Sequence, residues 1–483
     1  MKKLLPVILL TALVCGMFTS CNGGASGGTD TKTESMTENA GSDIERIDLG
    51  GYEIRFLARG EGSGGFTCID LYAEGMNGDR INDAVYERNS YLEETYNFKL
   101  RMTGVSVSVS GYAESPATIA RTSVLAQEDV YDVVYDSMNQ TAPLLQEKML
   151  VDLYTLPHVD FSKPYWDQSV NKDVSIGGKL YTTHGEHMLS VRAGLYSTFF
   201  NKQIADDLGL GDLYAIVRNN KWTVEKYYGL AKDVAADLNG DGKLGLEDLW
   251  GLTSESFNAL VFFEGAGEKI TAKDNNDLPM LALNTPRAES VLALSSAFLT
   301  DKNSAILFDN YSSDKWPLLT KIWEEGRSLF FLGPLTQTPD FRNMAPDFGI
   351  LPAPKYEESQ ERYYHIVSIW NASLLVVPVT VTHRDEIGYI LELLAAKSAD
   401  TLTPAFYDIQ LTTKVIRDVD SKEMIDIILS SATFDLGASY DFGGLVRQVV
   451  LKIGASGGNF ASSYAANESA AQKAIDEFTE AVK

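Results

Sequence analysis

The amino-acid sequence predicts an α/β protein with two lobes. Strand-like and helix-like segments alternate in the first third of the chain, as they do where crossover helices cover a parallel sheet. Folding is expected to begin near Ile47, and the roughly 440 residues that follow are too many for a single hydrophobic core. Hydrophobic residues form 45% of the chain and aromatic residues 10%, which is ordinary for a globular body. These observations favour two α/β lobes.

The N-terminal segment has the layout of an export signal. Two lysines precede an apolar run at 4–17 that is too short to cross a bilayer. The sequence Phe-Thr-Ser-Cys at 18–21 follows, and it resembles a bacterial lipobox, in which the cysteine becomes the lipidated N-terminus. Cys21 is therefore the predicted lipidation site; Cys15 is a second candidate, and ordinary cleavage is the alternative. We expect an extracytoplasmic protein that is lipid-anchored to the cell membrane.

Residues 22–44 are mainly Gly, Ser, Thr, Asn and acidic residues, with almost nothing to bury. This composition predicts a disordered tether with a reach of about 25 Å. No later segment approaches the roughly 18 uninterrupted apolar residues of a membrane span. The anchor is therefore expected at the N-terminus alone.

The charge balance bears on possible partners. The chain has 66 acidic and 41 basic residues, a formal net charge of −25. A negative field of this size repels phosphate backbones, so nucleic acid is not an expected partner. With Cys21 acylated, Cys68 has no cysteine to pair with and is expected to be a small apolar filler.

Hydrophobic periodicity defines the individual elements. In the first part of the chain we predict strands at 52–57, 97–105 and 130–135, with helices at 79–96 and 116–127. Further along we predict helices at 224–236, 289–299, 316–325 and 384–396, a strand at 368–377, and a C-terminal amphipathic helix whose apolar face runs from Ala470 to Val482. Thr223 is a good N-cap for the helix that follows it.

The segment 237–248 has the spacing of a calcium-binding loop. Side-chain oxygens fall at loop positions one, three and five, a glycine at position six allows a sharp turn, and a carboxylate arrives at position twelve. The predicted ligands are Asp237, Asn239, Asp241, the main-chain carbonyl of Lys243, and Asp248. The glutamate before the last ligand is an alternative, and a turn without metal is the competing interpretation. We expect a structural Ca²⁺ with a dissociation constant on the order of 10⁻⁴–10⁻³ M.

Two other motifs do not support a chemistry of their own. Gly60–Gly65 matches the glycine pattern of dinucleotide-binding loops, but no helix opens directly on it, so a flexible loop is expected. His184–His187 has a glycine where the zinc-peptidase motif needs a glutamate. Catalysis is therefore not predicted.

Four segments carry a resemblance to a known family. They are Ile81–Asn89; Lys221–Thr223 with the loop that runs to Gly251; Glu325–Phe330 followed by Gly333–Pro334; and Phe348–Pro354. Their order resembles that of extracellular solute-binding proteins of carbohydrate ABC importers, the group that includes maltose-binding protein. The resemblance implies a type II periplasmic-binding-protein-like fold, in which two α/β lobes close on a ligand. It also implies a monomer that delivers its solute to the membrane subunits of an importer.

The resemblance further implies that the chain crosses between the lobes near 154–195 and again near 352–370. The expected division is lobe 1 at 45–154, lobe 2 at 155–351, a return to lobe 1 at 352–400, and a helical C-terminal part at 401–483 that belongs mainly to lobe 2. Neither lobe is then one continuous segment.

Candidate ligand contacts are aromatic residues beside Asp or Asn in expected loops, since sugars bind flat aromatic faces surrounded by fixed polar groups. The candidates are Trp166 with Asp167, Trp370 with Asn371, and Tyr440 with Asp441. For each aromatic side chain, burial in the core is the competing interpretation. The expected function is capture of a mono- or oligosaccharide for import; the alternatives are a secreted calcium-stabilised carbohydrate-active enzyme and a surface adhesion lipoprotein.

Overall fold

The computed structural model describes residues 41–63, 67–107, 114–311, 316–338, 340–370, 372–412 and 419–483. The chain separates into two compact units, Met1–Glu38 and Asn39–Lys483, and the fold is that of the second. Cys21, most of the expected tether and Asn371 lie outside the described residues. Within the described residues, no helix is both long enough and apolar enough to cross a bilayer.

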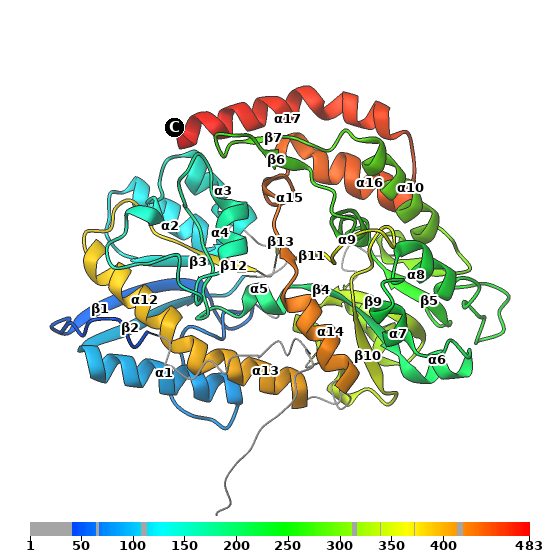
Figure 1. Cartoon of the computed structure of the whole chain (residues 1–483), viewed down its shortest axis with the longest axis horizontal. Helices are drawn as coiled ribbons and strands as arrows, with labels where there is room; N and C mark the ends of the chain where they lie inside the picture. Colours follow the sequence, from blue (N-terminus) through cyan, green and yellow to red (C-terminus); the bar gives the residue numbers. More distant parts are fainter. Residues whose placement is uncertain are drawn as a thin grey trace, which may run out of the picture. The chain divides into compact units, whose positions relative to one another are not determined.

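The first lobe is built on a four-stranded sheet (Figure 1). Its strands are β1 (Tyr52–Arg59), β2 (Phe98–Val105), β3 (Val133–Ser137) and β12 (Ser373–Val376), in the order β12-β3-β1-β2. β1 is parallel to β2 and β3, whereas β12 returns antiparallel to β3. The helices of this lobe are α1 (Arg80–Tyr96), α2 (Pro116–Leu125), α3 (Met138–Gln146) and α12 (Arg384–Asp400). The predicted alternation of strands and helices is confirmed.

Helix α1 begins and ends where its sequence favours it. The carboxylate of Asp79 accepts hydrogen bonds of 3.0 Å from the amides of Ile81 and Asn82 and so caps the first turn. Ile81 and Val85 lie on its buried face, as their spacing predicts. The helix ends at Asn97, whose φ of 54° is a left-handed conformation that asparagine adopts more readily than most residues.

The second lobe is built on a five-stranded sheet. Its strands are β4 (Tyr196–Asn201), β5 (Trp250–Ser254), β8 (Ala305–Leu307), β9 (Ser328–Pro334) and β10 (Phe348–Pro352), in the order β10-β4-β9-β5-β8. Adjacent residues of β9 belong to separate apolar clusters, Phe330 to one and Phe331 to the other, so both faces of this sheet are covered. The helices are α6 (Lys202–Asp207), α7 (Leu213–Arg218), α8 (Val224–Ala231), α9 (Asn258–Gly265), α10 (Pro286–Leu299) and α11 (Trp316–Glu324).

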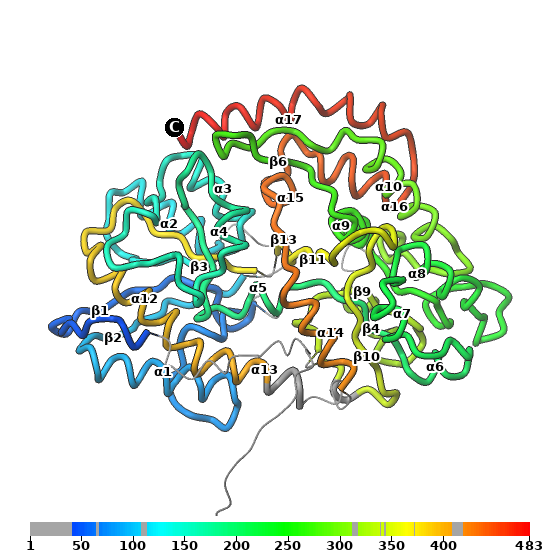
Figure 2. Tube along the Cα trace, in the orientation of Figure 1, coloured from blue at the N-terminus to red at the C-terminus, as the bar shows by residue number. Residues whose placement is uncertain are grey.

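The chain passes between the lobes at two neighbouring places, which can be followed in Figure 2. Leu195, just before β4, pairs with Val367, which follows strand β11 (His365–Ile366). The amide of Ser368 donates a 2.7 Å hydrogen bond to the carbonyl of Gly194. The two crossovers are therefore hydrogen-bonded to each other, as in a paired hinge.

Residues 155–193 pack with lobe 1, although the sequence analysis assigned them to lobe 2. They include helices α4 (Gln168–Val174) and α5 (Ser190–Ala193). Thr183 pairs with Leu375 of β12, which fixes this segment to the sheet of lobe 1. The first lobe therefore extends to the crossover at 194–195, and its partners for this segment come about 200 residues later in the chain, where local periodicity carries no information about them.

A hairpin of lobe 2 reaches this same segment of lobe 1. Its strands are β6 (Thr271–Lys273) and β7 (Pro279–Leu281). The carboxylate of Asp277 in its turn accepts hydrogen bonds of 3.1 Å from the Ser175 hydroxyl and from the Gly178 amide. The Gly177 amide donates to the carbonyl of Asp277, and Lys273 pairs with the Asp277 carboxylate at 2.9 Å. The lobes therefore touch at this hairpin contact as well as at the crossovers.

The C-terminal part contacts both lobes rather than mainly lobe 2. Its elements are α13 (Leu402–Thr412), α14 (Val419–Leu429), β13 (Ala432–Thr433), α15 (Leu436–Tyr440), α16 (Lys452–Ser456) and α17 (Phe460–Val482). α13 contacts α1 of lobe 1, whereas α14 packs on β10 of lobe 2. β13 pairs with β11 at the crossover, and α17 contacts both α3 and β7. This part ties the two lobes together.

Candidate functional site

A pocket lies where both lobes meet the second crossover and the C-terminal part. Its lining residues are Met138, Glu264, Ile366, Val367, Ser368, Ile369, Ala372, Thr433, Phe434, Asp435, Ala438 and Ser439. Met138 begins α3 of lobe 1 and Glu264 lies in α9 of lobe 2, so both lobes contribute to the lining. A molecule held here contacts both lobes at once.

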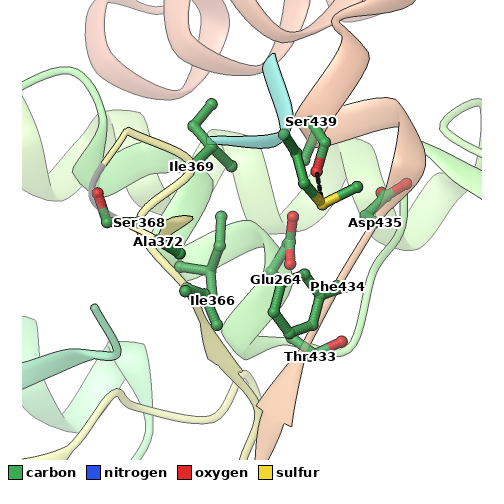
Figure 3. Close-up of a pocket in the computed structure, with 12 residues that line it drawn as sticks. Glu264, Ile366, Ser368, Ile369, Ala372, Thr433, Phe434, Asp435 and Ser439 are labelled. Atoms are coloured by element: carbon green, nitrogen blue, oxygen red, sulfur yellow. Dashed lines mark hydrogen bonds between the residues drawn. The ribbon is translucent and has the colours of Figure 1, made fainter. Parts of the chain in front are cut away.

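Glu264 is the most unusual residue of the pocket. Its side chain is 1% exposed, and neither carboxylate oxygen has a hydrogen-bond partner among the residues that the structure describes. Figure 3 shows the carboxylate directed into the space between the lining residues. Burial raises the pKa of this carboxyl well above its usual value, and the negative charges of Asp435 and Asp173 add to that rise while Lys269 opposes it. Its place in the last turn of α9, at the negative end of the helix dipole, is a further electrostatic disadvantage.

Asp435, the second carboxylate in the lining, is in the opposite situation. It caps α15 by accepting a 2.7 Å hydrogen bond from the Gly437 amide. It also accepts from the Thr271 hydroxyl at 2.6 Å and from the amides of Ile270 and Thr271. Asp435 therefore holds the start of β6 against α15, and its oxygens are fully used by the protein.

On the lobe 1 side, a buried ion pair positions the crossover. Arg59 at the end of β1 and Asp136 in β3 are both fully excluded from solvent and are joined by a 2.7 Å hydrogen bond. Arg59 also donates to the Ser137 hydroxyl and to the main-chain carbonyl of Trp370, at 2.6 Å each. The carboxyl ends of two parallel strands, where α/β folds place their ligands, are thereby fixed to the segment that lines the pocket.

Of the predicted ligand residues, Trp166 and Asp167 lie away from the pocket lining. Trp166 is 1% exposed and its indole N–H donates to Glu392 at 2.8 Å, so its ring is in the core of lobe 1. Asp167 caps α4 by accepting hydrogen bonds of 3.0 Å from the amides of Ser169 and Val170. Both side chains therefore stabilise the fold, which is the competing interpretation that the sequence left open.

The other two predicted pairs lie next to the pocket in sequence. Trp370 is half-buried and stands between the lining residues Ile369 and Ala372, and Asn371 lies outside the described residues. Tyr440 follows the lining residue Ser439, but its ring packs against Phe478 of α17 with 4.7 Å between the centroids.

Asp441 has a structural role in this arrangement. It lies in a left-handed conformation with φ of 47°, accepts from the Val446 amide at 2.7 Å and pairs with Arg447 at 2.8 Å. Both predicted segments therefore adjoin the pocket, and their neighbours line it.

Glu264 is not among the ligand residues predicted from the sequence. The signal for it was present, because Glu264 is a single carboxylate in the otherwise apolar run Ala259–Phe263 and Gly265. Charged residues are almost never fully buried without a partner, so a lone glutamate in such a run marks a special site.

The predicted calcium loop has a compact conformation. The carboxylate of Asp237 accepts from the amides of Gly240 and Gly242, at 2.7 and 2.8 Å. Both glycines have φ of 76°, which other residues adopt at a cost. Asp248 is buried and accepts from the Leu238 and Gly245 amides, at 2.9 and 2.7 Å. Among the described residues, no three His, Cys, Asp or Glu side chains are gathered closely enough to hold a metal ion without other ligands.

Comparison with known proteins relates the fold to that of transport proteins. No protein-family model and no curated protein matches this sequence. The galacto-N-biose-/lacto-N-biose I-binding protein of the ABC transporter from Bifidobacterium longum, solved with lacto-N-biose, has a TM-score of 0.59 at 14% identity and covers 89% of this chain and 98% of its own. The maltose/maltodextrin-binding domain of Bdellovibrio bacteriovorus, bound to maltotriose, has a TM-score of 0.55 at 15% identity. The match covers 88% of this chain and 100% of that domain.

A third solved structure, UgpB from Mycobacterium tuberculosis in complex with glycerophosphocholine, also gives a TM-score of 0.55 at 15% identity and covers 88% of this chain and 99% of its own. The chain therefore has the two-lobe fold of maltose-binding-protein-like solute-binding proteins, as its sequence predicts. The ligands of these three structures differ in chemistry, so the fold by itself does not select one.

Proposed function

We propose that this protein captures a carbohydrate between its two lobes and delivers it to an ABC importer. The observation that carries the proposal is the pocket at the crossovers. Its walls come from both lobes, and it contains a buried carboxylate that has no hydrogen-bond partner among the residues that the structure describes. The solved structures of the same fold include proteins bound to maltotriose and to lacto-N-biose, which supports a saccharide as the ligand.

Capture by lobe closure follows from the position of the pocket. Ser368 lines the pocket and its amide is bonded to Gly194 in the other crossover, so the hinge and the ligand are neighbours. A ligand that contacts Met138 on one lobe and Glu264 on the other has its full set of contacts only when the lobes are together. Binding then shifts the population towards the closed arrangement, which the membrane subunits of the importer recognise.

The chemistry of the lining suits a saccharide. Met138, Ile366 and Phe434 are apolar and complement the C–H faces of a pyranose, and Ser368, Thr433 and Ser439 carry hydroxyl groups. A mono- or oligosaccharide is the proposed ligand, and the protein is proposed to bind it as a monomer.

The pocket supports binding better than glycan cleavage. Glycoside hydrolysis uses two carboxyl groups, one of which donates a proton while the other acts as base or nucleophile. Of the two carboxylates in the lining, Asp435 is committed to four hydrogen bonds within the protein. Release of reducing sugar from a glycan by the purified protein would favour the enzyme instead.

Two further proposals concern the surroundings of the binding body. We propose that Cys21 is lipidated and that the following segment tethers the protein outside the cell, near the importer; incorporation of labelled palmitate, lost in Cys21→Ser, tests this. We also propose that the loop from Asp237 to Asp248 binds a structural Ca²⁺. The proposal is supported by the loop sequence and by its tight turn, on which Asp237, Asn239 and Asp241 lie. Arg327 holds the end of the loop by donating to the Asp248 carbonyl at 3.1 Å.

A thermal-shift screen tests the proposed function. Neutral mono- and disaccharides are added to the purified mature protein, with peptides, polyamines and glycerophosphodiesters as the other arms. A saccharide that raises the unfolding midpoint supports the proposal. A rise with a peptide or a polyamine, and with no saccharide, rejects it.

A further inference from the structure

We infer that Glu264 sets the ligand specificity of the pocket: it requires a saccharide that presents two adjacent hydrogen-bond donors and it excludes anionic saccharides. The donors are either two neighbouring hydroxyls or the hydroxyl and ammonium group of an amino sugar. This inference rests on the proposed function, because it names the chemical class of the solute that the same pocket takes.

Among the described residues, Glu264 has no hydrogen-bond partner. All the residues of α9 are buried, and both carboxylate oxygens lack a hydrogen bond among the described residues. Buried polar groups in native proteins are nearly always satisfied, and an exception calls for a partner that is bound from outside. The pocket that the carboxylate faces is where such a partner enters.

Another buried glutamate, Glu392, has hydrogen-bond partners within the protein. Glu392 in α12 is 3% exposed, and its oxygens accept hydrogen bonds from the Tyr165 hydroxyl at 2.5 Å and from the Trp166 indole at 2.8 Å. The fold therefore satisfies a buried glutamate where the role is structural. At Glu264 neither oxygen has a partner in the described part of the chain, and the carboxylate faces the pocket.

The charges around Glu264 are mainly negative. The charged groups that act on Glu264 are Lys269, Asp435 and Asp173. Lys269 is already engaged, since its ammonium group donates to the Thr433 hydroxyl at 2.6 Å and lies 4.0 Å from Asp173. With Lys269 engaged and Asp435 and Asp173 negative, a carboxylate or phosphate on a ligand is repelled, whereas hydroxyl or ammonium donors stabilise the ionised form of Glu264, which burial disfavours.

The geometry of a carboxylate favours two neighbouring donors on the ligand. Its two oxygens accept from two donors on neighbouring atoms, as they do in a bidentate pair with arginine. The adjacent hydroxyls of a pyranose present this spacing. Elsewhere in the lining, the Met138 sulfur accepts a hydrogen bond from the Ser439 hydroxyl at 3.5 Å, so Met138 adds a soft apolar surface to the pocket.

The test compares wild type, Glu264→Gln and the control Glu392→Gln by calorimetry. The three ligand arms are the neutral sugar that gives the largest thermal shift, its 2-amino analogue and its uronic acid. The wild type is expected to bind the neutral or the amino sugar at least ~10-fold more tightly than the uronic acid, and Glu264→Gln is expected to lose ~10–100-fold in affinity for the preferred sugar. Tighter binding of the amino sugar identifies an ammonium donor, and tighter binding of the neutral sugar identifies a hydroxyl pair.

A second readout separates a ligand role from a structural role. The Glu264 carboxyl is buried and has no hydrogen-bond partner among the described residues. Glu264→Gln is therefore expected to raise the unfolding midpoint of the ligand-free protein at neutral pH, whereas Glu392→Gln lowers it and leaves the dissociation constant within ~2-fold. Equal affinity of wild type and Glu264→Gln for the sugar, or a lower midpoint of ligand-free Glu264→Gln, overturns the inference while the proposed function stands. If the wild type binds no saccharide at all, the proposed function fails, and the inference fails with it.

Discussion

Arg59 in the first strand of lobe 1 donates a 2.6 Å hydrogen bond to the main-chain carbonyl of Trp370 in the second crossover. The same guanidinium pairs with Asp136, and both side chains are closed off from solvent. One buried ion pair therefore holds two strand ends and the start of the pocket segment in a fixed arrangement.

Arg59→Met is expected to destabilise lobe 1 strongly, by about 3–5 kcal/mol, because it leaves the Asp136 carboxylate buried and uncompensated. Arg59→Lys keeps the charge but loses the planar fork, with a smaller loss on the order of 1–2 kcal/mol. Urea unfolding measures both. The double variant Arg59→Met/Asp136→Leu is the control and is expected to recover most of the loss; a single Arg59→Met that unfolds like wild type contradicts this role.

His365 is expected to make stability depend on acid pH. Its Nε2 accepts from the Ala353 amide at 2.9 Å, its Nδ1 lies 2.8 Å from the Ser431 hydroxyl, and burial lowers its pKa to about 3. In the unfolded chain the ring takes up a proton near pH 6.5, so between these values the unfolded state binds more protons and the free energy of unfolding falls as the pH falls. The titration of His365 alone is expected to lower the free energy of unfolding by about 2 kcal/mol between pH 6.5 and pH 5.

His365→Gln tests the assignment, because glutamine keeps hydrogen-bonding capacity without titrating. The variant is expected to lose less stability than wild type over the same pH interval in urea titrations. It will retain part of the dependence, since burial also lowers the pKa of His184, to about 4. Parallel losses in wild type and variant would show that His365 does not contribute.

The proposed calcium site predicts a stability that depends on the ion. With a dissociation constant of about 10⁻⁴–10⁻³ M, Ca²⁺ at ~10 mM adds roughly 1.4–2.7 kcal/mol to the free energy of unfolding. The unfolding midpoint is therefore expected to rise with calcium and to fall with chelator. Asp241→Asn, which keeps an oxygen for the Lys243 amide but removes a charge, is expected to weaken the response. An unfolding midpoint that is identical in calcium and in chelator would contradict the proposed calcium site.

The hairpin contact predicts a further effect on ligand affinity. Asn replaces Asp277 without strain at its φ of 61°, yet it removes the charge that pairs with Lys273 and weakens the bonds to Ser175 and Gly178. If the closed state is destabilised relative to the open state by about 0.5–1 kcal/mol, the ligand is expected to bind ~2–5-fold more weakly. Glu477→Gln, which removes the exposed i,i+4 pair with Lys473 on α17, is the control. Equal affinities in Asp277→Asn and wild type would show that this contact does not bias closure.

The elements of lobe 1 follow from the sequence because its strands and helices alternate regularly, as at 52–57 and 79–96. The strands of lobe 2 do not, because β4 and β9 are buried on both faces and lack the two-residue period. The strand predicted at 368–377 is confined to Ser373–Val376, since residues 368–370 are held in the crossover by Gly194 and Arg59.

The site shows the same division between local and long-range information. The segments around Trp370 and Tyr440 were expected near the ligand, and they adjoin the pocket. Whether an aromatic ring faces the pocket or the core depends on a distant partner: Trp166 is bonded by Glu392, 226 residues later in the chain. No local pattern contains that contact, so the sequence left the alternatives open.

The most direct test of the central claim is a calorimetric titration of the mature protein and of Ile369→Trp with the sugar that stabilises it best. Ile369 is a half-buried residue of the pocket wall, and a larger ring there is expected to fill the space; Ile427→Trp, at a half-buried position outside the lining, is the control. Wild type and Ile427→Trp are each expected to bind one saccharide per chain, and Ile369→Trp is expected to lose binding. Undiminished binding by Ile369→Trp would contradict capture of the solute between the lobes.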